Sequence, residues 1–204
     1  MNLYYYIYMI FYKVKTDFIK VISKFYVLFL FKAFNVKHEK FIVNGLPVIR
    51  VGKNGRISIG NNFKMNNGKH FNQIGRQQPC FFIVNGKLVL KNNVGISNSA
   101  IICQNKITIG NNVKIGGNTV IYDTDFHSVD FKERRNFEID LEEAHSEEII
   151  IGDDVFIGAH TTILKGVQVG NRSVIGACSL VTTHIPPDEI WGGVPARFIK
   201  KISQ

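Results

Sequence analysis

The sequence predicts an all-β protein, a parallel β-helix that follows an N-terminal helical segment and is interrupted by a protruding loop at about residues 123–148. Aliphatic residues at every sixth position predict the β-helix, helical spacing near the N-terminus predicts the helix, and a gap in the six-residue pattern predicts the loop. We expect a helical, amphipathic segment over residues 1–45, the β-helix over 46–187 and a C-terminal cap over 188–204.

The N-terminal segment has apolar residues on one face and lysines on the opposite face. The apolar face follows the three-and-four spacing of a helix: Phe11, Val14, Phe18, Val21, Ile22, Phe25, Leu28 and Phe29. No uninterrupted apolar run approaches the roughly 20 residues that cross a bilayer, and the start lacks the features of a signal peptide. Two interpretations stay open. The helix packs on the protein's own body or a neighbouring subunit, or it lies on the inner face of a membrane with its lysines toward anionic lipid.

The six-residue pattern is most regular after the gap. Ile or Val occupies each sixth position from Ile151 to Val181, and the same spacing joins Ile109, Ile115 and Ile121. This period fits neither a helix nor a plain strand, so we interpret each unit as a very short strand and a turn with its aliphatic side chain in a shared interior. Three units make a triangular coil of about 18 residues, and such coils stack as a parallel β-helix.

Two details refine the earlier repeats. Leu90, Ile96 and Ile102 form another set with this spacing, displaced by one residue. Glycine or asparagine is expected where a turn needs a positive φ, as in the Gly-Asn-Asn sequences at 60–62 and 110–112.

Charge and cysteine usage limit the class of protein. The chain has 204 residues and a net charge of +9, with no acidic residue between positions 54 and 122 and ten acids between 123 and 148. A basic body favours anionic partners, but its basic residues are dispersed and no nucleic-acid recognition motif occurs, so we expect no nucleic acid partner. The three cysteines are far apart in the sequence, which argues against a disulfide-stabilised fold. We therefore expect the protein in the reducing environment of the cytoplasm.

The repeat resembles that of a known enzyme family. Hexapeptide-repeat acyltransferases carry the same [Ile/Val]-Gly-x-x-x-x repeat, and the similarity covers about residues 88–202. The end of the chain, IGACSLVTTHIPPDEIWGGVPARFIKKI, resembles that of the galactoside, maltose and cell-surface polysaccharide O-acetyltransferase branch. The resemblance implies a left-handed β-helix, a homotrimer with active sites between neighbouring subunits, and acetyl transfer from acetyl-CoA to a carbohydrate hydroxyl.

The loop contains the sequence Asp-Thr-Asp-Phe-His, which ends at His127. A neutral imidazole can remove the proton of an alcohol as it attacks a thioester, and a nearby carboxylate can fix its tautomer. The resemblance places the catalytic base of the family on His127, although a surface histidine is the alternative. Asp125 or Asp130 can supply the carboxylate.

The resemblance also suggests residues that bind the two substrates. For the acceptor sugar, Asn98 matches a hydrogen-bonding asparagine, with a simple turn asparagine as the alternative, and Asp130 is a second candidate. For acetyl-CoA, the implied residues are Ala159 and Ala177 along the pantetheine arm, Thr182 and Thr183 further along, and Arg197 and Lys200 at the phosphates. Arg197 and Lys200 lie one turn apart if the tail is helical; a solvated basic tail is the alternative.

A metal and a cysteine nucleophile are not expected. No His-x4-His pair occurs, so we predict no metal site. Cys178 lies inside a regular repeat without a neighbouring activating group, so we interpret it as a small packing residue.

These observations predict an O-acetyltransferase that uses acetyl-CoA to acetylate a sugar or a cell-surface polysaccharide precursor. We expect a homotrimer in the cytoplasm, and contact with the inner face of the membrane stays open. Two other functions stay open. One is acetyl transfer to an amino sugar or another small acceptor such as an antibiotic, and the other is a non-catalytic trimeric scaffold.

Overall fold

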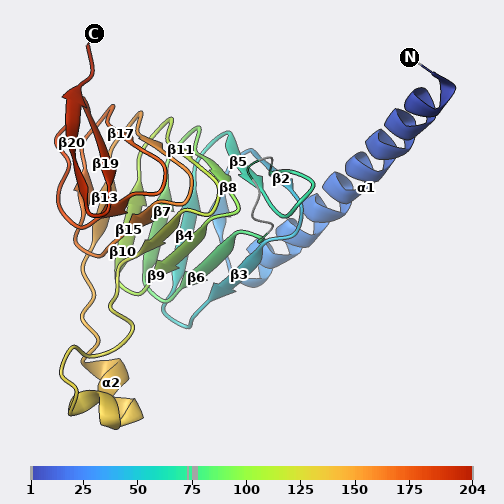
Figure 1. Cartoon of the computed structure of the whole chain (residues 1–204). Coiled ribbons are helices and arrows are strands. Elements are labelled where there is room, and N and C mark those ends of the chain that lie inside the picture. Colours follow the sequence, from blue (N-terminus) through green and yellow to red (C-terminus); the bar gives the residue numbers. More distant parts are fainter. Residues whose placement is uncertain (1, 73, 75–77, 204) are drawn as a thin grey trace.

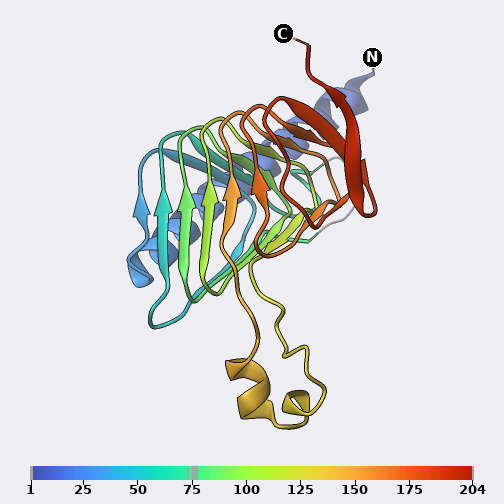
Figure 2. The same ribbon diagram turned by 90° about the vertical axis from the view of Figure 1, so that its left-hand side faces the viewer.

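The body of the protein is a three-sided parallel β-helix in a computed structural model that describes residues 2–72, 74 and 78–203 (Figures 1 and 2). Its sides are three sheets, which we name A, B and C. Sheet A contains β1 (Lys37–His38), β4 (Arg56–Ile59), β7 (Lys87–Leu90), β10 (Lys106–Ile109), β13 (Ile149–Ile151) and β16 (Gln168–Val169). Sheet B contains β2 (Phe41–Asn44), β5 (Phe63–Asn66), β8 (Gly95–Ser97), β11 (Lys114–Ile115), β14 (Phe156–Ile157), β17 (Val174–Ile175), β19 (Glu189–Gly193) and β20 (Ala196–Lys201). Sheet C contains β3 (Val48–Val51), β6 (Phe81–Val84), β9 (Ala100–Cys103), β12 (Val120–Tyr122), β15 (Thr162–Ile163) and β18 (Leu180–Val181).

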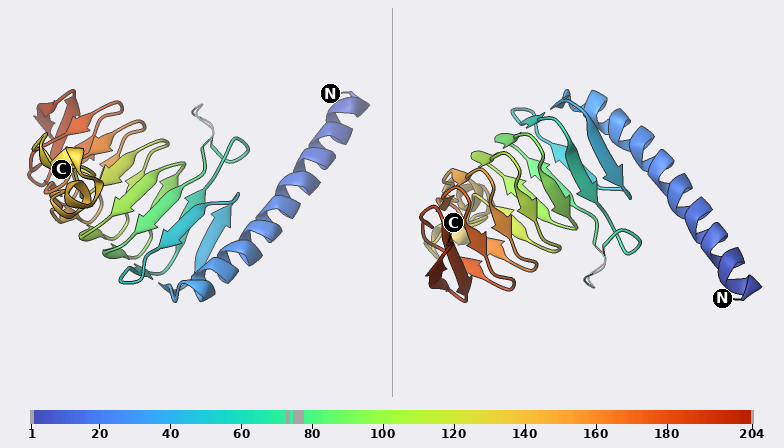
Figure 3. Two further views of the ribbon diagram at one scale, coloured as in Figure 1. Left: turned by 90° about the horizontal axis from the view of Figure 1, so that it is seen from below. Right: turned by 90° about the horizontal axis from the view of Figure 1, so that it is seen from above.

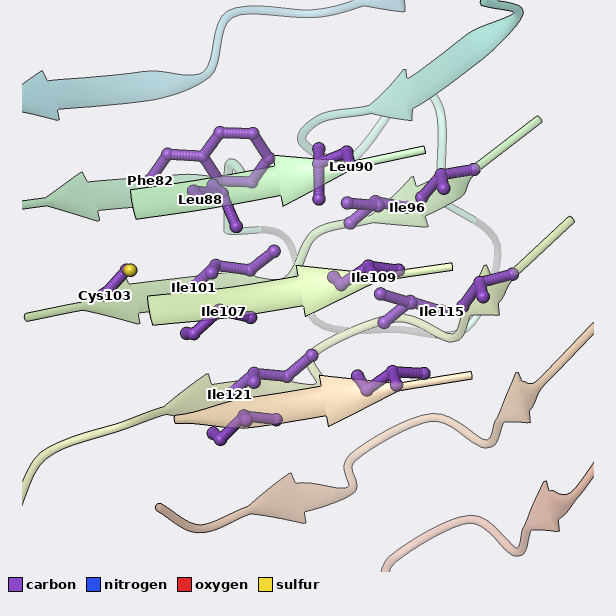
Figure 4. Close-up of a cluster of buried hydrophobic side chains, with 14 of the residues drawn as sticks. Phe82, Leu88, Leu90, Ile96, Ile101, Cys103, Ile107, Ile109, Ile115 and Ile121 are labelled. Atoms are coloured by element: carbon purple, nitrogen blue, oxygen red, sulfur yellow. The ribbon is translucent and has the colours of Figure 1, made fainter. Parts of the chain in front are cut away.

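The interior consists of aliphatic side chains stacked from coil to coil (Figure 4). In sheet A, Leu90 pairs in register with Ile109, and Ile109 with Ile151. In sheet B, Ile96 pairs in the same way with Ile115. All five side chains are buried, and each contributes about 1.5–3 kcal/mol by leaving water. The six-residue period therefore reflects an inward position that recurs once on each side of a coil.

One expected interior residue is displaced. The spacing predicts Ile102 inside, but Ile101 is the buried residue and pairs with Ile121, whereas Ile102 is half-buried. The corner that follows Ile96 is one residue shorter than the corner that follows Ile115, and this difference shifts the inward position by one.

The corner between sheets A and B is a column of residues with left-handed backbone. Asn62, Asn93 and Asn112 have φ values of 57°, 60° and 59°, and Asp154 continues the column at 60°. Their side chains form a ladder in which each amide donates to the next coil, at 3.1, 2.8 and 2.9 Å. The last asparagine of each Gly-Asn-Asn thus takes the positive φ. Gly110 has a different role, because a Cβ there would lie 2.4 Å from a side-chain oxygen of the next coil.

The long helix α1 (Leu3–Ala33) precedes the β-helix and is about 46 Å long. Its last turns pack on the first coil, where Val27 and Phe31 are buried and the Phe31 ring lies 5.1 Å from that of Phe41. The remainder of α1 projects away from the body (Figures 1 and 3). Because β1 and β2 already belong to the first coil, the expected boundary at residue 45 is too late, and the helix ends at Ala33.

The apolar face of α1 points away from the β-helix. Its members are 43–71% exposed, apart from the half-buried Leu28: Phe11, Val14, Phe18, Val21, Ile22, Phe25 and Phe29. The buried positions are Thr16, Ser23, Val27 and Phe31, which form a different face. The helix does pack on its own body, but not through the face that the sequence predicted for such packing.

The predicted loop leaves the β-helix between β12 and β13 and protrudes from it (Figures 1 and 2). It contains a 3-10 turn, η1 (Glu133–Arg135), and the short helix α2 (Phe137–Glu142). The interruption of the six-residue pattern therefore marks the extent of the excursion.

The C-terminal segment forms a hairpin and not a helix. Strand β19 extends sheet B in parallel beside β17, and β20 turns back antiparallel to β19. Trp191 is half-buried in this hairpin, 6.5 Å from the Phe198 ring, and donates a hydrogen bond to Glu189. Because Arg197 and Lys200 lie on a strand, where they pair with Gly192 and Ile190, the expectation that they lie one helical turn apart is wrong.

Candidate active site

The excursion over residues 123–148 has a closed base. Its two ends form an antiparallel bridge between Thr124 and Ser146, and the Asp125 amide donates to the His145 carbonyl oxygen at 3.0 Å. Asp123 is fully buried, and its carboxylate accepts hydrogen bonds from the backbone N–H groups of Gln104 and Asn105, in the turn of the preceding coil, at 2.7 and 3.0 Å. The loop is thus held to a rigid coil at its root.

Within the loop, His127 forms a pair with Asp140. The distance from His127 Nδ1 to Asp140 Oδ2 is 2.7 Å. The histidine side chain is 66% exposed and the aspartate 8% exposed. The hydrogen bond with His127 lowers the pKa of Asp140, and the backbone hydrogen bond from Ser128, 2.7 Å long, lowers it further.

This contact determines which ring nitrogen is available. An ionised carboxylate accepts hydrogen bonds only, so Nδ1 of His127 carries the proton that it shares with Asp140. In the neutral ring, Nε2 then has a free lone pair. Because the ring is largely exposed, a substrate hydroxyl can approach Nε2, which makes the pair suited to general-base chemistry.

The loop fixes both members of the pair. Asn136 caps α2, its side chain accepting from the amides of the first turn at 3.0 and 3.3 Å, and α2 carries Asp140. On the histidine side, Arg134 donates to the carbonyl oxygens of Ser128 and Val129 at 2.6 and 2.7 Å. The Ser128 hydroxyl also bonds the Glu133 carboxylate.

The carboxylates expected beside His127 lie elsewhere. Asp125 forms an ion pair with Lys165 at 3.3 Å. Asp130 is exposed and accepts from the Lys132 amide at 2.7 Å. The partner of His127 is instead Asp140, thirteen residues along the chain. The one local signal for it is Asn136, a helix-capping residue followed by a short apolar–acidic stretch.

Asn98 lies on the β-helix, on a different corner from the loop. It is buried, has a φ of 46° and occupies the corner between β8 and β9, on the side where Asn118, His160 and Cys178 also take positive φ. It lines a small hollow of about 70 Å³ with Asn118 and Ala100. The loop leaves from the corner between sheets C and A, so the structure does not bring Asn98 and His127 to one corner of the coil.

The residues expected at acetyl-CoA fall into three places. Ala159 and Ala177 stack on one corner, where the Cys178 amide donates to the Ala159 carbonyl oxygen at 2.8 Å. Thr182 and Thr183 are exposed on the next corner, after β18. Arg197 and Lys200 are exposed on β20 at the C-terminal end of the β-helix.

Metal-ligating side chains do not gather in the part of the chain that the structure describes. No group of three His, Cys, Asp or Glu side chains there is arranged to hold a metal ion. All three cysteines are free thiols, two of them buried and Cys178 exposed. Burial raises the pKa of the Cys80 thiol to about 12, which keeps it protonated and unreactive.

Comparison with known proteins identifies the family. Residues 148–183 match the family model described as bacterial transferase hexapeptide, six repeats. The Escherichia coli (strain K12) protein WbbJ, named as an O-acetyl transferase of lipopolysaccharide biosynthesis, is 30% identical over 160 residues, which cover 74% of this chain and 74% of WbbJ. The chain belongs to the hexapeptide-repeat transferase family. The resemblance predicted from the repeat and the C-terminal motif is confirmed.

One further relative in sequence and two solved structures are similar to this transferase. Galactoside O-acetyltransferase of E. coli (strain K12) is 44% identical over 77 residues, which are 38% of this chain and 36% of that relative. A structure of galactoside acetyltransferase in complex with coenzyme A has a TM-score of 0.55 and 32% identity over 82% of this chain and 64% of that one. The hexapeptide-repeat acetyltransferase VCA0836 of Vibrio cholerae has a TM-score of 0.60 and 26% identity over 95% and 92%. The predicted left-handed parallel β-helix is thereby confirmed for the transferase.

Proposed function

We propose that this protein is an acetyl-CoA-dependent O-acetyltransferase that acetylates a hydroxyl of a sugar in a cell-surface polysaccharide precursor. The observation that carries the proposal is the His127–Asp140 pair, which presents an accessible Nε2 beside a β-helix of this family. The names of WbbJ and of galactoside O-acetyltransferase support O-acetylation of carbohydrate.

In the proposed reaction, Nε2 of His127 takes the proton of the acceptor hydroxyl. The hydroxyl oxygen forms a bond to the thioester carbonyl carbon of acetyl-CoA, and the tetrahedral intermediate then loses the C–S bond. The leaving thiolate receives the proton from the imidazolium, so atoms and charge balance. Asp140 acts as a positioning residue, because its carboxylate holds Nδ1 and stabilises the imidazolium while the proton resides on it.

We propose the stacked corner of Ala159 and Ala177 as the place of the pantetheine arm. Small side chains leave the backbone accessible there, and Gly158 lets the two coils approach closely, since a Cβ on it would lie 2.4 Å from the Ala177 nitrogen. The exposed Arg197 and Lys200 at the same end of the β-helix supply positive charge for the phosphates. Thr182 and Thr183 remain proposed contacts along the arm.

We propose a homotrimer in which the site is completed by a neighbouring subunit. Within one chain, His127 is largely exposed and Asn98 lies on a different corner of the coil. An acceptor that contacts both residues is thus more readily held between two chains. We place the enzyme in the cytoplasm, because all three cysteines are free thiols.

The test is a transfer assay with a matched pair of histidine variants. Release of coenzyme A thiol is measured with a panel of sugar acceptors for wild type, His127→Ala and His145→Ala, a second exposed histidine of the same loop. We expect His127→Ala to lower kcat/KM by about 10²–10⁴-fold, while His145→Ala stays within a few-fold of wild type. Binding of acetyl-CoA by calorimetry should be the same in all three.

Three results separate the alternatives. Equal activity of His127→Ala and wild type would remove His127 as the base. Acetylation of amino sugars in preference to hydroxyl acceptors would assign the enzyme to N-acetylation. A chain that binds no acetyl-CoA at millimolar concentration would point to a non-catalytic scaffold.

The role of Asp140 has its own readout. Asp140→Asn keeps the shape of the side chain but removes the charge that stabilises the imidazolium. We expect the acid limb of the kcat/KM profile to move to lower pH, in addition to a lower maximal rate. A reduced rate with an unchanged pH profile would indicate that Asp140 only supports the loop structure.

A further inference from the structure

Helix α1 presents a large apolar surface that the β-helix does not cover. We propose that α1 docks on the surface of a membrane that contains anionic phospholipid, with the helix lying in the plane of the interface. The surface has two parts, which we name the tip, residues 3–12, and the outer stripe, formed by Phe11, Val14, Phe18, Val21, Phe25 and Phe29. This inference goes beyond the chemistry proposed above and does not depend on it.

The tip is apolar around its whole circumference. Every residue from Leu3 to Tyr12 is apolar or aromatic, and each of these side chains is 40–78% exposed. A helix that is apolar on all sides is normally buried. Four of its first six residues are tyrosine, at Tyr4, Tyr5, Tyr6 and Tyr8. Tyrosine has an apolar ring and a polar hydroxyl, which suits the headgroup region of a bilayer.

The outer stripe continues the apolar surface along the helix. Its side chains are 54–71% exposed and follow one line on the face opposite the buried Ser23 and Val27. The stripe therefore faces away from the body, and α1 itself leaves the body (Figures 1 and 3). A flat surface can reach both the tip and the stripe without displacing the β-helix.

The charges of α1 suit an anionic surface. Lys13, Lys20 and Lys24 lie at helical spacings of seven and four residues on the far side of the helix from the stripe, where they stay exposed. The one acid of α1, Asp17, is paired with Lys20 at 2.9 Å. Lysine side chains can bury their stems and reach the lipid phosphates with their ammonium groups. The basic body behind the helix, with no acid over residues 54–122, adds to the attraction.

The same features disfavour insertion across the bilayer and a purely protein partner. Within the described residues no helix is both long and apolar enough to cross a membrane. Aromatic residues at seven-residue intervals, Tyr4, Phe11, Phe18 and Phe25, also fit a coiled-coil seam with a second copy of this chain. Such a seam covers only one side of the tip, whereas an interface into which the tip sinks can also take up the tyrosine rings on its flanks at headgroup depth. The all-round apolar tip therefore favours the membrane.

The test is flotation of the full chain with vesicles. One set contains phosphatidylcholine alone, and the other contains about 30% phosphatidylglycerol. We expect binding to the anionic vesicles that weakens as salt is raised to about 0.5 M. The variant Tyr4→Gln/Phe11→Gln should lower the bound fraction by at least about tenfold. The matched control, Val129→Gln/Phe137→Gln, changes two loop residues of similar exposure and should bind as wild type does.

The outcomes that overturn the proposal are distinct. Absence of binding to anionic vesicles contradicts it, as does equal loss of binding in both variants. Oxidative cross-linking then tests the second copy. Val14→Cys and Lys13→Cys are compared in a Cys178→Ser background. If Val14→Cys forms a disulfide between chains efficiently, Lys13→Cys does not, and the protein binds no vesicles, the apolar surface of α1 contacts a second copy of the chain. Equal melting temperatures of the two glutamine variants exclude unfolding as the cause, and transfer activity is measured separately without vesicles.

Discussion

Replacing Asp123 with alanine should detach the root of the loop over residues 123–148 from the β-helix. The Asp123 carboxylate is fully buried and accepts two backbone hydrogen bonds, from Gln104 at 2.7 Å and Asn105 at 3.0 Å. A hydrogen bond to a charged group contributes about 1.5–3 kcal/mol. We use the lower figure for each, because Gln104 and Asn105 are exposed and water can replace part of the loss. Asp123→Ala should therefore lower the free energy of unfolding by about 3 kcal/mol.

The matched control for this prediction is Asp125→Ala, two residues further along the same motif. Asp125 makes a half-exposed ion pair with Lys165, which contributes less than about 1 kcal/mol. Both variants are compared with wild type by urea unfolding at one fixed protein concentration, since assembly would otherwise change the midpoint. Equal destabilisation by the two variants would refute the anchoring role of Asp123. Loss of transfer activity in Asp123→Ala without loss of stability would instead assign Asp123 to the chemistry.

Three further predictions concern the coils. Gly158→Ala places a Cβ 2.4 Å from the Ala177 nitrogen, so it should lower the free energy of unfolding by about 1–3 kcal/mol. It should also weaken acetyl-CoA binding in calorimetry, and an unchanged affinity would contradict our placement of the pantetheine arm. Ile121→Ala removes a fully buried side chain and should cost about 2–5 kcal/mol in urea unfolding, and a loss below about 1 kcal/mol would mean that the core closes around the gap. Hydrogen bonds from the Arg172 guanidinium hold the pKa of Asp188 in the folded protein below its ordinary value of 3.8. The stability that this pair contributes is therefore complete above pH 3.8 and is lost as the pH falls through the pKa of Asp188 in the folded protein. Asp188→Asn should therefore lose less stability than wild type between pH 4 and pH 2, and parallel pH curves would show that the pair contributes nothing.

Much of the fold was predictable because the repeat is a local signal. An inward aliphatic residue that recurs on each side of a coil is visible as a six-residue period. The turn asparagines at Asn62 and Asn112 are recognisable because few residues tolerate a positive φ. The extent of the loop was equally readable, since the period stops after Ile121 and resumes at Ile151, close to the end of β12 at Tyr122 and the start of β13 at Ile149. His127 was a candidate base because of its residue type and its place at the start of that interruption.

The partner of His127 was not predictable from spacing. Asp125 and Asp130 are closer to it in the sequence, but Asp140 meets it because the chain turns back through η1 and the capped helix α2. In an irregular loop rich in acids, no period indicates which carboxylate faces inward. The C-terminal tail shows the same limit, because pairing of β19 with β17 imposes a strand where Arg197 and Lys200 allowed a helix.

The sequence by itself therefore determined the repeating interior, the turn residues, the helix α1 and the limits of the loop, because each depends on contacts within one coil or one helical turn. The tertiary structure alone decided that Asp140 holds His127 and that the apolar stripe of α1 faces away from the body. Both depend on how segments that are distant in the sequence approach one another. A residue pattern shows which side chains share a face of a helix or strand, but it does not show which other segment, subunit or solvent contacts that face.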